Sequence, residues 1–366
     1  MTNPTLSRRS FSKMIGVGAA YAALEPKARA LDTASSNIVR LSSNENPYGP
    51  SPAALKAMTD GFSLAWRYPD EHADMLAEEL ARGHGVPVEQ VLLGDGSGEI
   101  LKLSAAAFTG RDKKIVIANP TFEAVARHAG VASAEVVKID LTSDYSHDLK
   151  KMLAASNGAG LVYICNPNNP TASITPKNEI SEFLAKVSPT TIVLVDEAYH
   201  HYVESKDYES VIPLVKQYPN LIVARTFSKI YGMAGLRCGY CVTQRGNISQ
   251  LKTHQIFDSV NIMALVAALA SLKDAEQVAR GQKLNSEVKK TVYAELDALG
   301  YRYIPSHANF MMIDMRREVR PIINAFRERD VEVGRLFPPL PNFMRVTIGT
   351  ASQMKTFLTA FREVMV

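Results

Sequence analysis

Short apolar runs recur along the middle of the chain, and each is bounded by polar residues. They have the length of β-strands, are rich in Val, Ile and Leu, and occupy residues 91–93, 115–117, 136–137, 161–164, 192–195, 221–223 and 240–242. Amphipathic helical stretches separate several of these runs. Strands that alternate with helices form a mostly parallel sheet that is covered on both faces. The pattern predicts an α/β fold with a seven-stranded sheet between helices.

The last third of the chain has a different pattern, in which helical stretches flank short strand-like runs. We expect helices over 263–272, 274–299 and 321–329, and strands over 301–304 and 309–314. Gly300 fits the position that follows a helix, where a left-handed conformation is common. A chain of 366 residues is long enough for a large domain and a smaller one. We therefore expect a smaller α+β domain at the C-terminal end.

The run at 221–223 leads into a stretch with unusual chemistry. Thr226 and Ser228 supply two hydroxyl groups, Lys229 an amine and Arg237 a guanidinium. A dianionic phosphate is bound by such hydroxyl and guanidinium donors, and an amine in a desolvated, electropositive site can form a Schiff base with an aldehyde. A single lysine is far more often a solvated surface residue. The neighbouring hydroxyl and guanidinium groups favour a different role for Lys229, in which its amine holds pyridoxal phosphate.

Other polar motifs also follow strand-like runs, at the edge where open α/β sheets bind ligands. Gly96, Ser97 and Gly98 come after the first run and precede a helix that we expect to open at about Glu99. Backbone N–H groups at a helix N-terminus make a phosphate cradle. Asp196 ends the fifth run, and a buried carboxylate is costly unless it meets a cation, such as a protonated pyridine nitrogen. That proton allows the ring to accept electrons from a substrate.

Two further residues suit the ring of such a cofactor. Phe122 follows the second run and can lie flat on an aromatic ring, although a phenylalanine alone is more often a core residue. Asn166 follows the fourth run, and its amide can hydrogen-bond the phenolic oxygen of pyridoxal. Each motif alone has a structural explanation, but their number and their common position at strand ends favour a cofactor site.

These motifs, in this order, resemble those of the fold type I pyridoxal-phosphate aminotransferases. The resemblance is closest to the histidinol-phosphate aminotransferase branch and extends from about Leu41 to the C-terminus. It implies an arm at 31–60 that contributes to the small domain, a large cofactor-binding domain at 61–265 and a small domain at 266–366.

The resemblance also implies roles for residues that the chain pattern alone does not single out. Tyr199 would donate to the same phenolic oxygen as Asn166, and Lys229, Asp196 and Tyr199 would form the catalytic group. The residues implied to bind the substrate are Asn46, Tyr48, Arg335 and Arg345. Tyr68 would reach the cofactor phosphate of a neighbouring subunit, so the resemblance implies a homodimer.

The expected reaction moves an amino group from a donor to a 2-oxo acid such as 2-oxoglutarate. The donor is a compound similar to histidinol phosphate, or an amino acid. Two alternatives stay open at this point. Threonine-phosphate decarboxylases and some lyases share the motif set, and an aminotransferase-like domain can serve as a regulator. The regulator would need a DNA-binding module, for which this chain has no basic helix-turn-helix.

The N-terminus has the pattern of an export signal. Residues 7–13, with Arg8 and Arg9, match the twin-arginine motif, a short apolar stretch follows, and Ala28-Arg29-Ala30 resembles a peptidase site. We expect a signal peptide at 1–30 and a periplasmic enzyme. The alternative is a basic amphipathic helix, which would leave the protein in the cytoplasm.

Composition excludes several other classes. Residues 1–30 hold five of the 41 basic and one of the 37 acidic residues, so the remainder is formally neutral and gives no reason to expect nucleic-acid binding. A hydrophobic content of 46% is typical of a globular protein, and we expect no stable membrane insertion.

Cys238 and Cys241 lie three apart in an expected strand, so their side chains point to opposite faces. We expect no disulfide, and no metal site at His200 and His201.

Overall fold

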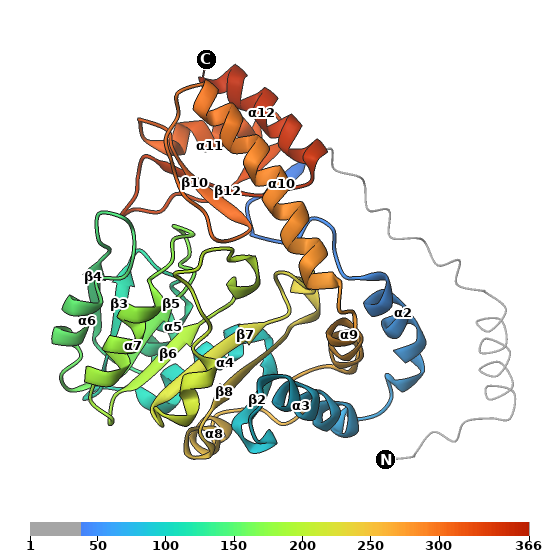
Figure 1. The fold of residues 1–366 in the computed structure, drawn as a ribbon, viewed down its shortest axis with the longest axis vertical. Coiled ribbons are helices and arrows are strands. Elements are labelled where there is room, and N and C mark those ends of the chain that lie inside the picture. Colours follow the sequence, from blue (N-terminus) through green and yellow to red (C-terminus); the bar gives the residue numbers. More distant parts are fainter. Residues whose placement is uncertain (1–37, 366) are drawn as a thin grey trace, which may run out of the picture. The chain divides into compact units, whose positions relative to one another are not determined.

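The computed structural model describes residues 38–365. One sheet contains all seven expected strands: β2 (Val91–Asp95), β3 (Lys114–Asn119), β4 (Val136–Asp140), β5 (Ala159–Cys165), β6 (Ile192–Asp196), β7 (Leu221–Thr226) and β8 (Cys238–Thr243). Their order across the sheet is β2-β8-β7-β6-β5-β3-β4. The pairs among β3 to β7 are parallel, and β8 is antiparallel to both of its neighbours. The predicted mostly parallel α/β sheet is confirmed (Figure 1).

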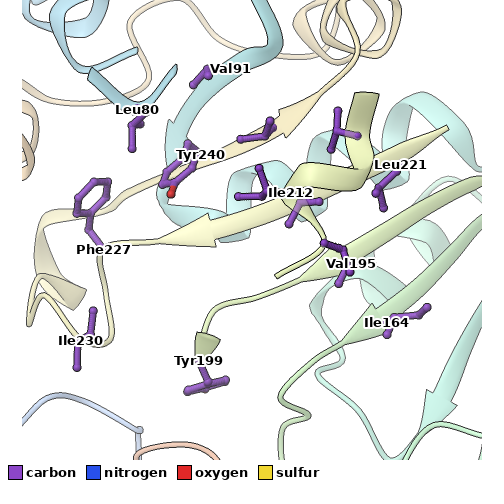
Figure 2. Packing of buried hydrophobic residues seen from close by; sticks show 14 of the residues in the cluster. Leu80, Val91, Ile164, Val195, Tyr199, Ile212, Leu221, Phe227, Ile230 and Tyr240 are labelled. Atoms are coloured by element: carbon purple, nitrogen blue, oxygen red, sulfur yellow. The ribbon is translucent and has the colours of Figure 1, made fainter. Parts of the chain in front are cut away.

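Helices cover both faces of this sheet. They are α2 (Pro52–Gly61), α3 (Asp70–His84), α4 (Gly96–Phe108), α5 (Ala124–Val131), α6 (Leu149–Ala155), α7 (Lys177–Lys186), α8 (Arg245–Lys252) and α9 (Ile262–Lys273). One core cluster joins α3, α6, α7 and α9 to one face of the sheet, and another joins α4, α5 and α8 to the other face. Figure 2 shows part of the first cluster, with Leu80 of α3, Val195 of β6 and Tyr240 of β8. Successive residues of β5 alternate between the two clusters, since Val162 belongs to the first and Tyr163 to the second.

Helix α4 begins earlier than the sequence indicates. It opens at Gly96 rather than at about Glu99. The side chain of Glu99 accepts a hydrogen bond from the N–H of Asp95 at 2.7 Å, which caps the first turn of the helix. The three glycine and serine residues of the expected phosphate cradle therefore form the first turn of α4.

The C-terminal part has its own core. It contains α10 (Gln277–Ala298), β9 (Tyr303–Ile304), β10 (Phe310–Asp314), α11 (Val319–Arg327), β11 (Val331–Val333), β12 (Phe343–Thr347) and α12 (Ala351–Met365). Strands β9, β10 and β12 form an antiparallel sheet, and β11 pairs in parallel with β1 (Val39–Leu41) from the start of the described chain. Gly300 follows α10 at φ +72°, as expected. This part and the arm share one hydrophobic cluster, while the domain boundaries at 60 and 265 stay predictions.

Short 3-10 helices complete the fold: η1 (Phe62–Leu64), η2 (Val88–Gln90), η3 (His200–Tyr202), η4 (Ile212–Lys216) and η5 (Ala234–Leu236). All three cysteines are buried and unpaired, and Cys238 and Cys241 pack into the clusters on opposite faces of the sheet. The expected signal peptide lies outside the described residues. Within residues 38–365, no helix is long and apolar enough to cross a membrane.

Candidate active site

A cavity of about 360 Å³ lies where β5, β6 and β7 end. That volume is within the usual range for small-molecule sites, and the position is the one where open α/β sheets bind ligands. The structure brings ten of the predicted site residues into its wall: Ser97, Gly98, Phe122, Asp196, Tyr199, Thr226, Ser228, Lys229, Arg237 and Arg345. They come from segments that are as much as 248 positions apart, between Ser97 and Arg345.

Lys229 lies in the turn after β7 with its amine in this cavity. Its Nζ donates a hydrogen bond to the backbone carbonyl of Asn44 at 3.1 Å and lies 5.5 Å from the centre of the Tyr199 ring. Burial, with the nearby positive charge of Arg345, lowers the pKa of Lys229 to about 8. A lysine in this state has a neutral fraction near neutral pH and can act as a nucleophile or a base.

Asp196 is the last residue of β6 and is buried. Its carboxylate accepts hydrogen bonds from the hydroxyl of Tyr163 at 3.0 Å and from the N–H of Ala198 at 3.1 Å. Burial raises the pKa of Asp196 to about 6, because a charged carboxylate is poorly solvated there. A cation in the cavity would relieve this cost. The residue therefore fits a protonated pyridine nitrogen.

The first turn of α4, the end of β7 and Arg237 form a compact group of donors. The Arg237 guanidinium donates to the carbonyls of Ala234 at 3.0 Å and Asp95 at 3.3 Å. The Thr226 hydroxyl donates to the Ser228 hydroxyl at 2.9 Å. A helix N-terminus, two hydroxyls and a guanidinium suit a dianionic phosphate.

Glycine is required where these elements meet. Gly96 has φ +71°, and a Cβ there would overlap the Arg237 guanidinium. A Cβ on Gly239 of β8 would overlap the backbone nitrogen of Ser97 and lie 2.6 Å from the carbonyl carbon of Gly96. The close approach of β8 to α4 therefore depends on these two glycines. It leaves the backbone donors of α4 beside the guanidinium, which is an arrangement that fits a phosphate.

The structure corrects the expectation for Asn166. Its amide donates to the carbonyl of Thr175 at 3.1 Å and accepts from the N–H of Thr175 at 2.9 Å, so both ends serve a turn rather than the cavity. Asn169 lies in the cavity wall instead. Its amide donates to the Tyr199 hydroxyl at 3.3 Å, which places Asn169 and Tyr199 together. The two asparagines belong to one Asn-Pro loop, and the conformation of that loop decides which of them faces the ligand.

The two predicted substrate arginines lie in adjoining spaces. Arg345 lines the cofactor cavity and donates to Asn169 Oδ1 and to the carbonyl of Ser42, both at 2.7 Å. Its Nε is buried without a hydrogen-bond partner among the described residues. Burial lowers the pKa of Arg345. Arg335 lines a neighbouring cavity of about 270 Å³, to which Arg345 also contributes.

Three predicted residues lie away from the cavity of their own chain. Asn46 donates to the carbonyl of Ile230 at 2.8 Å, and Tyr48 lies in an outer groove beside it. The side chain of Tyr68 is exposed, with 82% of its surface accessible. No contact of these residues within the single chain tests a role in binding, and their roles stay predictions.

The sequence alone did not identify Asn44. Its amide donates to the Tyr199 hydroxyl at 3.1 Å, and its carbonyl accepts from Lys229. Asn44 has φ +55°, a conformation that asparagine tolerates better than most residues. The resemblance implied Asn46 and Tyr48 of the arm, whereas the arm residues that hydrogen-bond Tyr199, Lys229 and Arg345 are Asn44 and Ser42.

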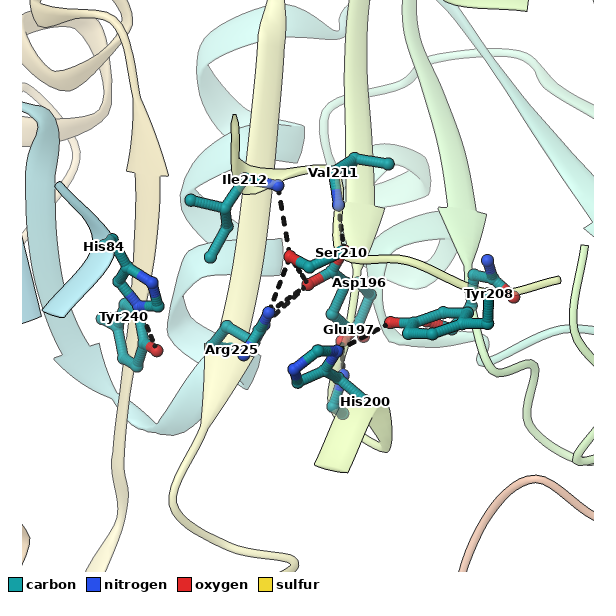
Figure 3. A network of polar contacts seen from close by, with 12 residues as sticks. His84, Asp196, Glu197, His200, Tyr208, Ser210, Val211, Ile212, Arg225 and Tyr240 are labelled. Carbon is teal, nitrogen blue, oxygen red and sulfur yellow. Dashed lines mark hydrogen bonds and ion pairs between the residues drawn. The ribbon is translucent and has the colours of Figure 1, made fainter. Parts of the chain in front are cut away.

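A buried polar network supports the strand ends next to Asp196 (Figure 3). Glu197 pairs with Arg225 of β7 at 2.6 Å, and the same carboxylate accepts from the hydroxyl of Ser210 and the N–H of Val211. A buried ion pair is stable only when its remaining hydrogen bonds are also made, as they are here. The network ties β6 to β7 immediately behind the cavity. Among residues 38–365 no group of three His, Cys, Asp or Glu side chains is placed to hold a metal.

Comparison with known proteins agrees with this geometry. Residues 36–361 match the family described as aminotransferase class I and II. A histidinol-phosphate aminotransferase of Moorella thermoacetica is 39% identical over 333 residues, which cover 90% of this chain and 86% of that protein. Histidinol-phosphate aminotransferase 2 of Pseudomonas fluorescens is 38% identical and covers 92% of both chains. The crystal structure of histidinol-phosphate aminotransferase from Sinorhizobium meliloti in complex with pyridoxal-5'-phosphate has a TM-score of 0.85 and 25% identity, covering 89% of this chain and 90% of that one.

The fold and the cavity thus define a pyridoxal-phosphate enzyme of fold type I. The chain belongs to the aminotransferase class I and II family. Its cofactor is pyridoxal phosphate, and its reaction is the transfer of an amino group to a 2-oxo acid. The predicted fold, cofactor and reaction class are confirmed, and the decarboxylase alternative is not favoured.

Proposed function

We propose that this aminotransferase uses an amino donor with an anionic group, and that histidinol phosphate is the first candidate. The observation that carries this proposal is the buried guanidinium of Arg345, whose Nε has no partner among the described residues and which lines both cavities. A buried guanidinium favours a carboxylate or phosphate, because its planar donors match their oxygens. The names of the relatives at 38–39% identity support the same donor.

Each residue of the cavity would have a separate role in the reaction. Pyridoxal phosphate, when bound, supplies a ring that accepts electrons from the substrate α-carbon. Asp196 would hold the proton on the ring nitrogen, and Tyr199 with Asn169 would orient the ring through its phenolic oxygen. Lys229 would first anchor the aldehyde carbon. Its freed Nζ would then take the proton from the α-carbon of the donor.

A donor panel tests the proposed substrate. We expect purified enzyme with 2-oxoglutarate to form glutamate fastest from histidinol phosphate, and more slowly from neutral amino acids. Arg345→Gln should raise KM for every anionic donor, because the buried guanidinium is the expected anion partner. Glutamate formation from neutral amino acids alone would contradict the proposed donor. Release of carbon dioxide without glutamate would show a decarboxylase.

We also propose that the enzyme is a homodimer in which Tyr68 serves the partner's site. Tyr68 lies in a short segment with two other exposed aromatic residues, Phe62 and Trp66. Phe257, with 95% of its surface exposed, borders a groove that the neighbouring Pro69 also lines. Aromatic side chains are enriched at protein interfaces, so these exposed residues support the proposed dimer.

Export to the periplasm is a separate proposal. It is supported by the arginine pair at positions 8 and 9 and by the Ala-Arg-Ala sequence that ends at residue 30. Cell fractionation of the full chain tests it, with an Arg8→Lys/Arg9→Lys variant as the matched control. We expect the wild-type enzyme in the periplasm and the variant in the cytoplasm. Wild-type enzyme in the cytoplasmic fraction would contradict export, and this result would leave the reaction unaffected.

A further inference from the structure

A second cavity adjoins the cofactor cavity and combines charged with aromatic side chains. The two cavities share Phe122, Asn169 and Arg345 in their walls. The lining of the second cavity, among the described residues, holds three arginines and a single acid, Glu123. A donor that reacts beside Lys229 can therefore extend its far end into a space with an excess of positive charge.

Arg335 is held in this second cavity independently of Glu123. Its guanidinium lies 4.4 Å from the centre of the Phe337 ring, a favourable distance for a cation over an aromatic face. The Arg345 guanidinium lies 5.1 Å from the centre of the same ring, so both arginines contact Phe337. Arg335 also donates to the carbonyl of Leu336 at 3.1 Å. None of these contacts involves the carboxylate partner of Arg335, so we expect them to remain when it is removed.

Glu123 pairs with one terminal nitrogen of the Arg335 guanidinium. Its Oε2 lies 2.8 Å from the Arg335 Nη2, and the two residues are 212 positions apart. Their side chains are 55% and 52% exposed. Exposed ion pairs contribute only about 0.2–1 kcal/mol, so a substrate anion can replace such a partner at little cost. The carboxylate therefore stands where the far anion of a substrate would bind.

We propose that Glu123 is a specificity-determining residue that competes with the distal anion of the substrate for Arg335. When Glu123 is paired with Arg335, its carboxylate balances the positive charge of the guanidinium. A neutral side chain of the donor can then lie against Phe122 and Phe337. A donor with a distal phosphate or carboxylate displaces Glu123 and takes over its partner. The inference rests on the proposed function, because it assigns the far end of that donor to this cavity.

Binding of two unreactive probes to the holoenzyme tests this competition. Glutarate and pentanoate have the same chain length, but only glutarate has a distal carboxylate. By isothermal titration calorimetry, we expect Glu123→Gln to lower the Kd of glutarate by a factor of about 1.4 to 5, the range expected for an exposed pair. The Kd of pentanoate should stay unchanged. The gain for glutarate should shrink at high ionic strength.

Two further variants serve as controls. Glu182→Gln removes the carboxylate of an exposed ion pair with Lys186 on α7 and should change neither Kd. In an Arg335→Gln background, Glu123→Gln should no longer affect glutarate. The proposal is overturned if Glu123→Gln leaves the glutarate to pentanoate ratio unchanged, or shifts it equally without Arg335. Failure of the proposed function would be seen separately, as a lack of glutamate formation in the donor panel.

Discussion

At the scale of single residues, the site depends on two ionisable groups whose pKa values burial shifts in opposite directions. The pKa of Asp196 is raised to about 6 and that of Lys229 is lowered to about 8. In both cases the largest cause is the loss of water around the charged form. The buried charge of Asp196 therefore lowers the stability of the cofactor-free protein, and a bound cation next to Asp196 would remove this destabilisation.

This cost gives a prediction for Asp196→Asn in the cofactor-free protein. The folded pKa of about 6 lies above the ordinary value of 3.8, so the folded state binds more protons between these values and loses stability as pH rises through them. At pH 8 the full cost, on the order of 2–3 kcal/mol, is present. We expect the asparagine variant to unfold at higher urea concentration than wild type at pH 8, with the difference roughly halved at pH 5.

The same variant should bind pyridoxal phosphate more weakly, because the asparagine cannot balance the ring cation. Chemical denaturation and cofactor titration measure the two effects. A variant that is less stable than wild type at both pH values would contradict the account of Asp196 as a strained buried acid.

Tyr163 is expected to position Asp196. Its hydroxyl donates to the carboxylate from the neighbouring strand β5 and favours the ionised form. Tyr163→Phe keeps the ring in the core but removes this donor. We expect cofactor affinity to fall by about tenfold or more, since hydrogen bonds to charged groups contribute about 1.5–3 kcal/mol. Fluorescence titration of the cofactor measures this change, with Tyr202→Phe, another buried tyrosine, as a control that should bind normally.

At the scale of elements, the hydrophobic pattern predicted the large sheet because its strands are short, apolar and separated by helices. The pattern of side chains carries no information about strand direction, so the antiparallel placement of β8 became visible only in the structure. The position of Asn169, rather than Asn166, in the cavity wall depends on the conformation of a loop, which residue types alone do not determine. The pairing of Glu123 with Arg335 joins distant segments and had no local signal.

The junction of β8 with α4 gives a prediction at this scale. In Gly239→Ala the new methyl group meets backbone atoms of Ser97, Gly96 and Arg225, and backbone atoms cannot move aside as the end of a flexible side chain can. We expect a loss of about 1–3 kcal/mol in stability, as for other overpacked sites, and weaker cofactor binding because the first turn of α4 is displaced. Gly246→Ala is the matched control, since a Cβ there meets no atom within 4 Å. If the two variants had the same stability in denaturation and the same cofactor affinity in titration, the close contact of β8 with α4 would not be important for stability or cofactor binding.

At the scale of the whole molecule, the arm connects the C-terminal part to Lys229. Strand β1 pairs with β11, and a few residues later Asn44 contacts both Thr347 of β12 and Lys229. The sequence motif predicted an arm near the substrate site, but these long-range contacts require the three-dimensional structure. A movement of the C-terminal part would therefore reach Lys229 through Asn44.

Subunit mixing tests whether Tyr68 acts across a dimer. Lys229→Ala and Tyr68→Ala should each lower activity strongly when measured alone. If Tyr68 serves the partner's site, each mixed dimer contains one site with both native residues. After equal mixing and subunit exchange, we expect about one quarter of the wild-type activity. If both residues served the same chain's site, no native site would form and mixing would restore no activity.

The most direct test of the central claim is chemical capture of the cofactor on its lysine. Borohydride reduction of the purified holoenzyme, followed by proteolysis and mass spectrometry, should place a phosphopyridoxyl group on the peptide that contains Lys229. The Lys229→Ala variant, treated in the same way, should carry no such group on that peptide. A wild-type Lys229 peptide without the label, or a label on another lysine, would contradict the assignment of this cavity as the active site.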